Sequence, residues 1–416
     1  MKVLVLGCGG VGVGAAGQFA NEKDVEKIIC GDADPKRAGQ LSEWVKELNP
    51  KVETSAVQVD ASSQENVASA AQGVDLIYNA TVPECNVPIL KACIEEGASY
   101  IDLAAFPPIP DVPEDLTIGG LMKLDDQAKA AGITAISEMG AAPGYMDIAT
   151  HHMVNQLDKA TKVRLKWFDR VDTSELATSW WPLGITGEFF GAPYPIVWEN
   201  GEFKEVDLIR SAENYDFPEP VGNGTVYTAT FHPELWLIPN LLPDGKGKSI
   251  TYVDLMGGMV NGDREMKDVW IEQIRRQTIK PSFDREIKSG DDMIEAFASS
   301  FIQPADYKDA YDKGIIKDAC CCCSAEVTGE KDGKSVRHTM YAVVTLNEAR
   351  KRVPFCNQVG YFVALTGTMA AMMIYRGEIE QKGVLTGDML EQPYEFLKNL
   401  EPKGIQLTEK IERDFL

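Results

Sequence analysis

KVLVLGCGGVG, at residues 2–12, decides the fold of the first third of this 416-residue chain. The run KVLVL is short and apolar, and the six residues after it match the pattern G-x-G-x-x-G. A helical pattern opens at about Gly12, and an acid, Asp32, lies twenty residues beyond that glycine. A strand, a glycine loop, a helix and an acid at this spacing are typical of a dinucleotide-binding βαβ unit.

Each glycine of this loop has an expected role in holding a dinucleotide. Gly7 permits the tight turn, Gly9 lets the backbone approach a pyrophosphate, and Gly12 lets the helix pack close to the strand. The pyrophosphate then lies on backbone N–H groups at the positive end of the helix dipole. The residues expected to form this part of the site are Gly7, Gly9, Gly10, Val11 and Gly12.

Asp32 indicates which dinucleotide is bound. It ends the second predicted strand, 27–31, where a carboxylate can accept hydrogen bonds from the adenosine ribose hydroxyls. A 2′-phosphate there would meet like charge, and the next residue is Ala33 rather than an arginine. We therefore expect Asp32 and Ala33 at the cofactor and NAD in preference to NADP, although Lys36 and Arg37 lie near enough to oppose that preference.

Polar residues also follow the third and fourth predicted strands, at 54–59 and 74–79. Asp60 is placed to face the adenine, and it is equally placed to cap a helix over 62–71. Loops at the carboxyl ends of parallel strands line the ligand crevice, so the loop after the fourth strand is expected at the cofactor unless it is an ordinary turn. Its residues are Asn79, Ala80 and Thr81.

Strand and helix patterns alternate as far as residue 136, which predicts an α/β fold with a doubly wound parallel sheet. The predicted strands are 2–6, 27–31, 54–59, 74–79, 99–103 and 133–136. Beyond about Asp147 the chain becomes rich in aromatic residues, glycine and proline. Predicted strands at 163–168 and 250–255, and a hairpin at 328–346 with its turn at EKDGK, indicate a second α+β domain with a mixed or antiparallel sheet.

Charge and cysteine usage exclude several classes of function. The chain has 41 Lys and Arg against 63 Asp and Glu, a net charge of −22, so nucleic acid and anionic membrane surfaces are poor partners. Four of the nine cysteines are consecutive, at 320–323, which is no disulfide framework and favours a reducing compartment, the cytoplasm. Neighbouring side chains in a strand point to opposite faces, so we expect small buried residues there and no metal site.

Two stretches resemble membrane signals. The apolar run 3–6 is too short for the core of a signal peptide. The uncharged stretch 353–375 is long enough to span a bilayer, but polar residues and glycine interrupt it at 357, 358 and 366–368. It is predicted to be a buried helix.

Five segments together resemble the saccharopine dehydrogenase-like reductases. They are GCGGVG (7–12), NATVPECN (79–86), YIDLAA (100–105), MGAAPGYMD (139–147) and EIEQKGVLT (378–386). The resemblance covers nearly the whole chain. It implies a Rossmann domain over 1–135, a substrate-binding domain over 136–354 that makes a homodimer, and C-terminal helices over 355–416 that return to the first domain.

The resemblance also implies an NAD(P)-dependent oxidoreductase acting on a C–N bond of an amino acid, of the saccharopine or lysine 6-dehydrogenase type. The alternatives are an imine reductase of the carboxynorspermidine dehydrogenase type and a non-catalytic NAD-binding regulator. The segment that the family writes as GxDPG reads Gly140-Ala141-Ala142-Pro143-Gly144 here, without the acid. Pro143 of this segment is expected at the cofactor.

Chemistry at a C–N bond needs a group that moves a proton on or off nitrogen. Asp102 follows the strand 99–101 and matches a family residue that faces the catalytic pocket, although a strand-end cap is an equal alternative. Glu138 and Asp147 can substitute for it. His232, in TFHPELW, is the second candidate, as acid, base or carboxylate partner.

An anionic substrate group needs a cation. Arg170 follows the strand 163–168 and precedes the indoles of Trp180 and Trp181, and a cation beside indoles can grip a carboxylate or an amine-bearing substrate. The alternative is a surface arginine with tryptophans in the core.

Overall fold

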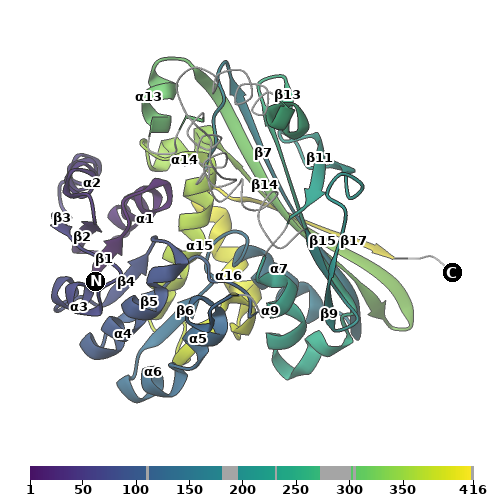
Figure 1. The fold of residues 1–416 in the computed structure, drawn as a ribbon, viewed down its shortest axis with the longest axis horizontal. Coiled ribbons are helices and arrows are strands. Elements are labelled where there is room, and N and C mark those ends of the chain that lie inside the picture. The colour runs from purple at the N-terminus through teal and green to yellow at the C-terminus, as the bar shows by residue number, and fades with distance from the viewer. Residues whose placement is uncertain (109–111, 180–194, 230–231, 272–300, 303–305, 414–416) are drawn as a thin grey trace, which may run out of the picture.

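The computed structural model describes residues 1–108, 112–179, 195–229, 232–271, 301–302 and 306–413. Two β-sheets lie side by side in it, with helices on the faces of the first and between the two (Figure 1). The first sheet is at the lower left of the view and the second runs down its right side.

The first sheet is parallel throughout and has the strand order β16-β6-β5-β4-β1-β2-β3. Its strands are β1 Lys2–Leu6, β2 Lys27–Asp32, β3 Glu53–Gln58, β4 Leu76–Asn79, β5 Ser99–Ile101, β6 Thr134–Ser137 and β16 Gly383–Thr386. Its helices are α1 Gly10–Ala20, α2 Pro35–Leu48, α3 Gln64–Ala70, α4 Asn86–Glu96, α5 Ile118–Met122 and α6 Asp125–Ala131. The predicted doubly wound parallel sheet is confirmed.

Helix α2 shows why these segments fold as they do. Pro35 stands at its first position, and the side chain of Asp34 accepts a hydrogen bond from the Lys36 N–H. The buried residues Ala38, Leu41 and Val45 form one apolar stripe, which packs the helix onto the sheet.

The second sheet is mixed, and its main path runs β10-β11-β12-β7-β14-β15-β17. Strand β7 pairs in parallel with β12 and antiparallel with β14. The strands are β7 Lys159–Thr173, β8 Ile196–Glu199, β9 Glu202–Glu205, β10 Glu213–Asp216, β11 Asn223–Thr228, β12 Tyr252–Asn261, β13 Arg264–Glu265, β14 Ile316–Lys331, β15 Lys334–Thr345 and β17 Gln406–Arg413. The predicted mixed sheet of the second domain is confirmed.

The remaining helices lie around and between the sheets. They are α7 Tyr145–Val154, α9 Glu234–Leu241, α13 Tyr307–Asp312, α14 Leu346–Arg352, α15 Gln358–Tyr375 and α16 Pro393–Leu400. Short 3₁₀ turns occur at η1 Pro83–Cys85, η2 Glu114–Leu116, η3 Pro243–Ser249, η5 Gly387–Met389 and η6 Glu401–Lys403.

The cysteine run lies in β14, next to the predicted hairpin. Asp332 and Gly333 form the two-residue turn between β14 and β15, with φ of 52° and 70°. Cys320 and Cys322 pack on one face of the sheet and Cys321 and Cys323 on the other, as the strand alternation predicted. All nine cysteines are free thiols. Among the described residues, no three His, Cys, Asp or Glu side chains are arranged to hold a metal ion.

Helix α15 fills the space between the two sheets (Figure 1). By length and composition it could span a membrane, but 78% of it is buried inside the protein, so the predicted buried helix is confirmed. Its first turns cross α1 at glycines. A Cβ on Gly14 would lie 2.7 Å from the carbonyl oxygen of Gly360, and a Cβ on Gly360 would lie 2.8 Å from that of Gly10.

The C-terminal segment differs from the expected set of helices. Between α15 and α16 the chain adds β16 to the first sheet beside β6, and after α16 it adds β17 to the second sheet beside β15. The segment therefore contributes to both domains. Six of the eight residues of β17 are exposed at the edge of the sheet and four of the eight are charged, so no alternation of apolar residues marked it as a strand. Strand β6 also extends to Ser137, two residues beyond the expected boundary at 135.

Gly14→Ala tests the contact between α1 and α15. The added methyl would meet backbone and side-chain atoms of the facing helix, so we expect the free energy of unfolding in urea to fall by about 1–3 kcal/mol. Gly39→Ala is the matched control, because a Cβ at that position in α2 meets no atom within 4 Å. Helix propensity alone should then raise stability by up to about 1 kcal/mol. Equal stability of the two variants would contradict the close packing.

Candidate active site

The glycine loop after β1 has the geometry of a phosphate cradle. Gly7 has a φ of 87°, and a Cβ on it would lie 2.6 Å from the carbonyl oxygen of Ala80. A Cβ on Gly12 would lie 1.8 Å from the Gly7 oxygen, whereas a Cβ on Gly9 would meet nothing within 4 Å. Helix α1 starts at Gly10 with no side-chain cap, so its first N–H groups are open to an anion on the side of Gly9.

Asp32 stands beside this loop at the end of β2. Its Oδ2 accepts a hydrogen bond from the Cys8 N–H at 2.7 Å, and its Oδ1 accepts one from the Asp34 N–H at 2.8 Å. These bonds orient the carboxylate, and each oxygen keeps a lone pair for a ribose hydroxyl. Ala33 follows and is exposed, and its carbonyl oxygen accepts a hydrogen bond from the Gln58 side chain.

Asp60 forms a local turn just after β3. Its Oδ1 accepts hydrogen bonds from the N–H of Ser62 at 3.0 Å and from its hydroxyl at 2.6 Å. The cap of α3 is Ser63, whose hydroxyl accepts the Asn66 N–H, so the expected alternative role of Asp60 as a helix cap is wrong. A contact with the adenine stays a prediction.

Asn79 organises the loop after β4. Its Nδ2 donates to Asn86 at 2.8 Å and to the Tyr100 hydroxyl at 3.1 Å, and its Oδ1 accepts from the N–H and hydroxyl of Thr81. With its side chain engaged in this way, Asn79 shapes the loop. A direct cofactor contact is therefore better expected from Ala80 and Thr81.

Acidic side chains gather where the chain leaves β5, β6 and β16 and enters α7 and α9. These strand ends share one edge of the parallel sheet, where ligands bind in such folds. All of them are buried, and burial or the neighbouring negative charges raise the pKa of Asp102, Glu138, Asp147 and Asp388. We call this group the acidic cluster; it consists of Asp102, Glu138, Asp147, Glu234 and Asp388.

Asp102 joins β5 to β6. It accepts hydrogen bonds from the Ser137 hydroxyl at 2.8 Å and from the Glu138 N–H at 2.9 Å. Burial raises its pKa to about 6, and the hydrogen bonds to Glu138 and Ser137 oppose that rise. A carboxyl group with this pKa is suited to proton transfer near neutral pH, and it is also a local cap, so both expected roles are open to it.

Glu138 is held in an unusual conformation beside Asp102. Its φ of 66° lies in the left-handed region, which residues with a Cβ rarely adopt. Its Oε1 accepts the Ala105 N–H at 3.0 Å, and its Oε2 is buried with no partner among the described residues. Burial, with the charge of Asp102 next, raises its pKa well above the usual value.

Three further acids of the cluster each bury one oxygen that has no partner in the part of the chain that the structure describes. These oxygens are Oδ1 of Asp147, Oε1 of Glu234 and Oδ2 of Asp388. Buried carboxylates without hydrogen-bond donors are costly. The arrangement is therefore suited to a ligand that supplies positive N–H donors.

His232 is paired with one of these acids. Its Nδ1 lies 3.1 Å from Oε2 of Glu234 in a buried setting. A carboxylate behind a histidine orients the ring and stabilises its charged form, which suits it for acid–base work. Sequence reasoning missed Glu234, although it stands two residues after His232 in the same segment. It also missed Asp388, because the strand before it was not recognised.

The structure does not support the expected grip of Arg170 on a substrate. Its guanidinium donates to the carbonyl oxygens of Val221 at 2.8 Å and Asn223 at 2.9 Å and lies over the Phe168 ring. Asp169, the preceding residue, faces α15, so Arg170 points to the opposite face of the sheet, where it holds the turn between β10 and β11. Trp180 and Trp181 lie outside the described residues.

The segment GAAPG makes the turn into α7. Its Ala142–Pro143 peptide is cis, and Pro143 is buried. The Gly144 N–H donates to Oδ2 of Asp147 at 2.7 Å, so the turn positions an acid of the cluster. The expected contact of Pro143 with the cofactor stays a prediction.

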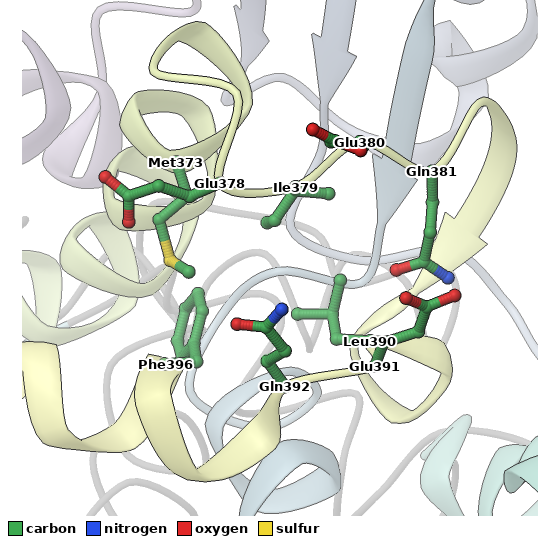
Figure 2. Close-up of a pocket in the computed structure, with 9 residues that line it drawn as sticks. All are labelled: Met373, Glu378, Ile379, Glu380, Gln381, Leu390, Glu391, Gln392 and Phe396. Atoms are coloured by element: carbon green, nitrogen blue, oxygen red, sulfur yellow. The ribbon is translucent and has the colours of Figure 1, made fainter.

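A separate pocket lies at the far end of α15 (Figure 2). Its cavity volume of about 30 Å³ is room for roughly one water molecule, which is too small for a substrate. Figure 2 shows Met373, Ile379, Leu390 and Phe396 meeting at its centre, while the carboxylates of Glu378 and Glu380 point outward.

Glu138→Gln tests the electrostatic cost of the acidic cluster. A carboxyl group whose pKa is higher in the folded than in the unfolded state stabilises the fold at low pH, and that contribution is lost as pH rises. We therefore expect the free energy of unfolding of the ligand-free protein to fall as pH rises above about 4.5. At pH 8 the free energy of unfolding of the variant should exceed that of wild type by about 1 kcal/mol, and at pH 5 this difference should be smaller.

Asp158→Asn is the control for this measurement. Asp158 is exposed and bonded to Lys331, which lowers its pKa, so this change should reduce stability slightly at pH 8. A Glu138→Gln variant that is less stable than wild type at both pH values would contradict the prediction that the buried Glu138 carboxylate destabilises the fold.

Comparisons with known proteins agree with this geometry. Residues 3–136 match the family described as saccharopine dehydrogenase NADP binding domain. The chain is 26% identical to carboxynorspermidine synthase of Vibrio cholerae, over 97% of this chain and 96% of that one. It is 23% identical to carboxyaminopropylagmatine dehydrogenase of Synechocystis sp., over 100% and 98% of the two chains.

Two solved structures share the fold over almost the whole chain. Apo saccharopine dehydrogenase (L-Glu forming) from Saccharomyces cerevisiae has a TM-score of 0.70 at 15% identity and covers 99% of both chains. Homospermidine synthase from Legionella pneumophila in complex with NAD has a TM-score of 0.68 at 14% identity, covering 99% of this chain and 91% of that one. The resemblance seen in the sequence motifs is confirmed.

Proposed function

We propose that this chain, whose residues 3–136 match the saccharopine dehydrogenase NADP binding domain, is an NAD(P)-dependent oxidoreductase acting on a C–N bond and that it reduces an imine formed by an amine substrate. This is the carboxynorspermidine dehydrogenase type, the expected alternative. It takes precedence over the saccharopine and lysine 6-dehydrogenase types, because both curated relatives above are named for carboxylated amines.

The acidic cluster is the observation that carries this proposal. Four of its buried oxygens have no donor in the described part of the chain. Apart from His232, no basic side chain among the described residues forms an ion pair with it. A protonated amine supplies both the charge and the N–H donors, through hydrogen bonds of about 1.5–3 kcal/mol each. A substrate with several carboxylates would meet like charge at the same place.

The residues of the site divide the chemistry as follows. The nicotinamide supplies or accepts the hydride. Asp102, with its raised pKa, and His232, oriented by Glu234, are the described groups suited to give or take the proton on the substrate nitrogen. The other acids of the cluster hold the ammonium end of the amine. A non-catalytic regulator would have no use for buried titrating groups, so this alternative is disfavoured.

The proposal is tested by following NADH or NADPH oxidation with purified protein. We expect turnover when an amino-acid semialdehyde is mixed with short diamines, and little with lysine and a 2-oxo acid. Glu234→Gln should raise the KM for the diamine at least about tenfold, and Asp102→Asn should lower kcat by roughly 10²–10⁴. Neither variant should change the Kd of the cofactor. Turnover confined to lysine and a 2-oxo acid would refute the proposed amine substrate. Full turnover of Asp102→Asn would show that Asp102 does not transfer the proton and would assign that role to His232.

We propose NAD as the preferred cofactor, on the position of Asp32. Its carboxylate can bond two ribose hydroxyls, at about 1.5–3 kcal/mol each, and would repel a 2′-phosphate. Arg37, the cation that could take over, has a 62% exposed side chain that lies 3.9 Å from Asp34. Wild type should show a higher kcat/KM with NAD(H), and Asp32→Ala should lose most of that preference. Asp60→Ala is the control and should keep the preference for NAD. Equal use of NADP by wild type would show that Asp32 does not bind the ribose.

We propose that the protein forms a homodimer through the second domain. A broad groove of about 720 Å³ crosses β7, β14, β15 and β17 on the face away from α15. Both cations and acids line it, so opposite charges of two copies can face each other across a twofold axis. They include Lys162, Arg164, Glu326, Arg337, Glu412 and Arg413. Light scattering should give twice the chain mass at micromolar concentration, and a monomer there would count against the dimer.

A further inference from the structure

Asp169 of β7 is a buried carboxylate that lies outside the acidic cluster. Its Oδ1 accepts a hydrogen bond from Nε2 of Gln358 at 2.8 Å, and its Oδ2 accepts one from the Ser179 hydroxyl at 2.7 Å. The residue is 1% exposed, and no basic side chain among the described residues forms an ion pair with it. A carboxylate buried without a cation destabilises the fold, so it persists only where its hydrogen bonds serve a function.

Gln358 connects this carboxylate to the cofactor side of the molecule. It is the first residue of α15, and the cap before it, Asn357, accepts the Gly360 N–H at 2.7 Å. That first turn rests on the start of α1, because a Cβ on Gly360 would lie 2.8 Å from the carbonyl oxygen of Gly10. Gly10 belongs to the glycine loop. Asp169 therefore fixes the backbone against which the loop rests.

The orientation of the Gln358 amide shows which contact dominates. Its Nε2 is directed at Asp169 and also lies 2.8 Å from the Ser179 hydroxyl, whereas its Oε1 is buried with no partner in the described part of the chain. An unpaired buried acceptor is unfavourable. The amide keeps this orientation because reversing it would turn an oxygen toward a carboxylate.

Ser179 connects the same carboxylate to α13 within the second domain. It lies in the segment that follows β7, and its hydroxyl lies 3.4 Å from the Tyr307 hydroxyl of α13. The Asp169 side chain therefore links β7 to the segment that follows it and, through Gln358, to helix α15, which packs against the glycine loop.

We propose that Asp169 is a positioning residue that holds the glycine loop in its binding geometry through Gln358 and α15, without touching cofactor or substrate. The proposal rests on the proposed function only in placing a nicotinamide dinucleotide at that loop. It predicts that cofactor affinity depends on a side chain of the other domain.

The experiment measures the Kd of NADH by fluorescence titration of the full chain without substrate, well below the unfolding temperature of each variant. We expect Asp169→Asn to raise the Kd about five- to tenfold. Gln358→Ala should raise it by a similar factor, and the double variant by no more than the larger single effect, because both act through one contact. The matched control is Asp254→Asn, a buried acid of the same sheet that is 2% exposed and bonded to Arg164.

The control separates positioning from general stability. Asp254→Asn should lower the unfolding temperature and leave the Kd of NADH within twofold of wild type. An unchanged Kd in Asp169→Asn, or an equal rise in the Asp254→Asn control, would overturn the role of Asp169 and leave the proposed function standing. If Asp169→Asn does not fold, an unchanged Kd of NADH in Gln358→Ala is sufficient to overturn the positioning role of Asp169. Wild type that binds neither NADH nor NADPH would refute the proposed function as well.

Discussion

Close backbone packing between α1 and α15 is the constraint on which the rest of this structure depends. Helix α15 comes from the C-terminal part of the chain, yet it fills the space between two sheets that the earlier residues build. Glycines at the crossing bring two backbones within contact distance, and Gly367 lets the same helix lie on the Tyr78 ring. Because interiors are close-packed, a displacement of this helix is transmitted to both sheets.

This packing also explains how two domains of different architecture make one site. The glycine loop belongs to the first sheet, and the strand edge that carries the acidic cluster belongs to β5, β6 and β16 of that sheet. Glu234 and His232 come from the start of α9, whose preceding strand is in the second sheet. The site therefore exists only when α15 holds the two sheets together.

The electrostatics of the site oppose stability and favour binding. All acids of the cluster are buried, burial raises the pKa of Asp102, Glu138, Asp147 and Asp388, and four of the cluster's oxygens are unpaired in the described structure. In the empty site these buried carboxylates destabilise the fold, whereas a cationic ligand pairs with them. Part of the binding free energy therefore comes from removing this destabilisation. The overall charge of −22 acts in the same direction, because it raises the local concentration of cations near the surface.

The sequence by itself determined the elements whose signals are local. The parallel sheet, the glycine loop, the Asp332-Gly333 turn and the buried nature of α15 follow from periodicity, spacing and the steric freedom of glycine within a few residues. Only the tertiary structure decided the rest. The acidic cluster joins residues from 102 to 388, β16 and β17 became strands through pairing with distant partners, and Arg170 was turned away from the site by the alternation of β7. These outcomes depend on contacts between segments far apart in the chain, and such contacts leave no periodic trace in the residues that make them.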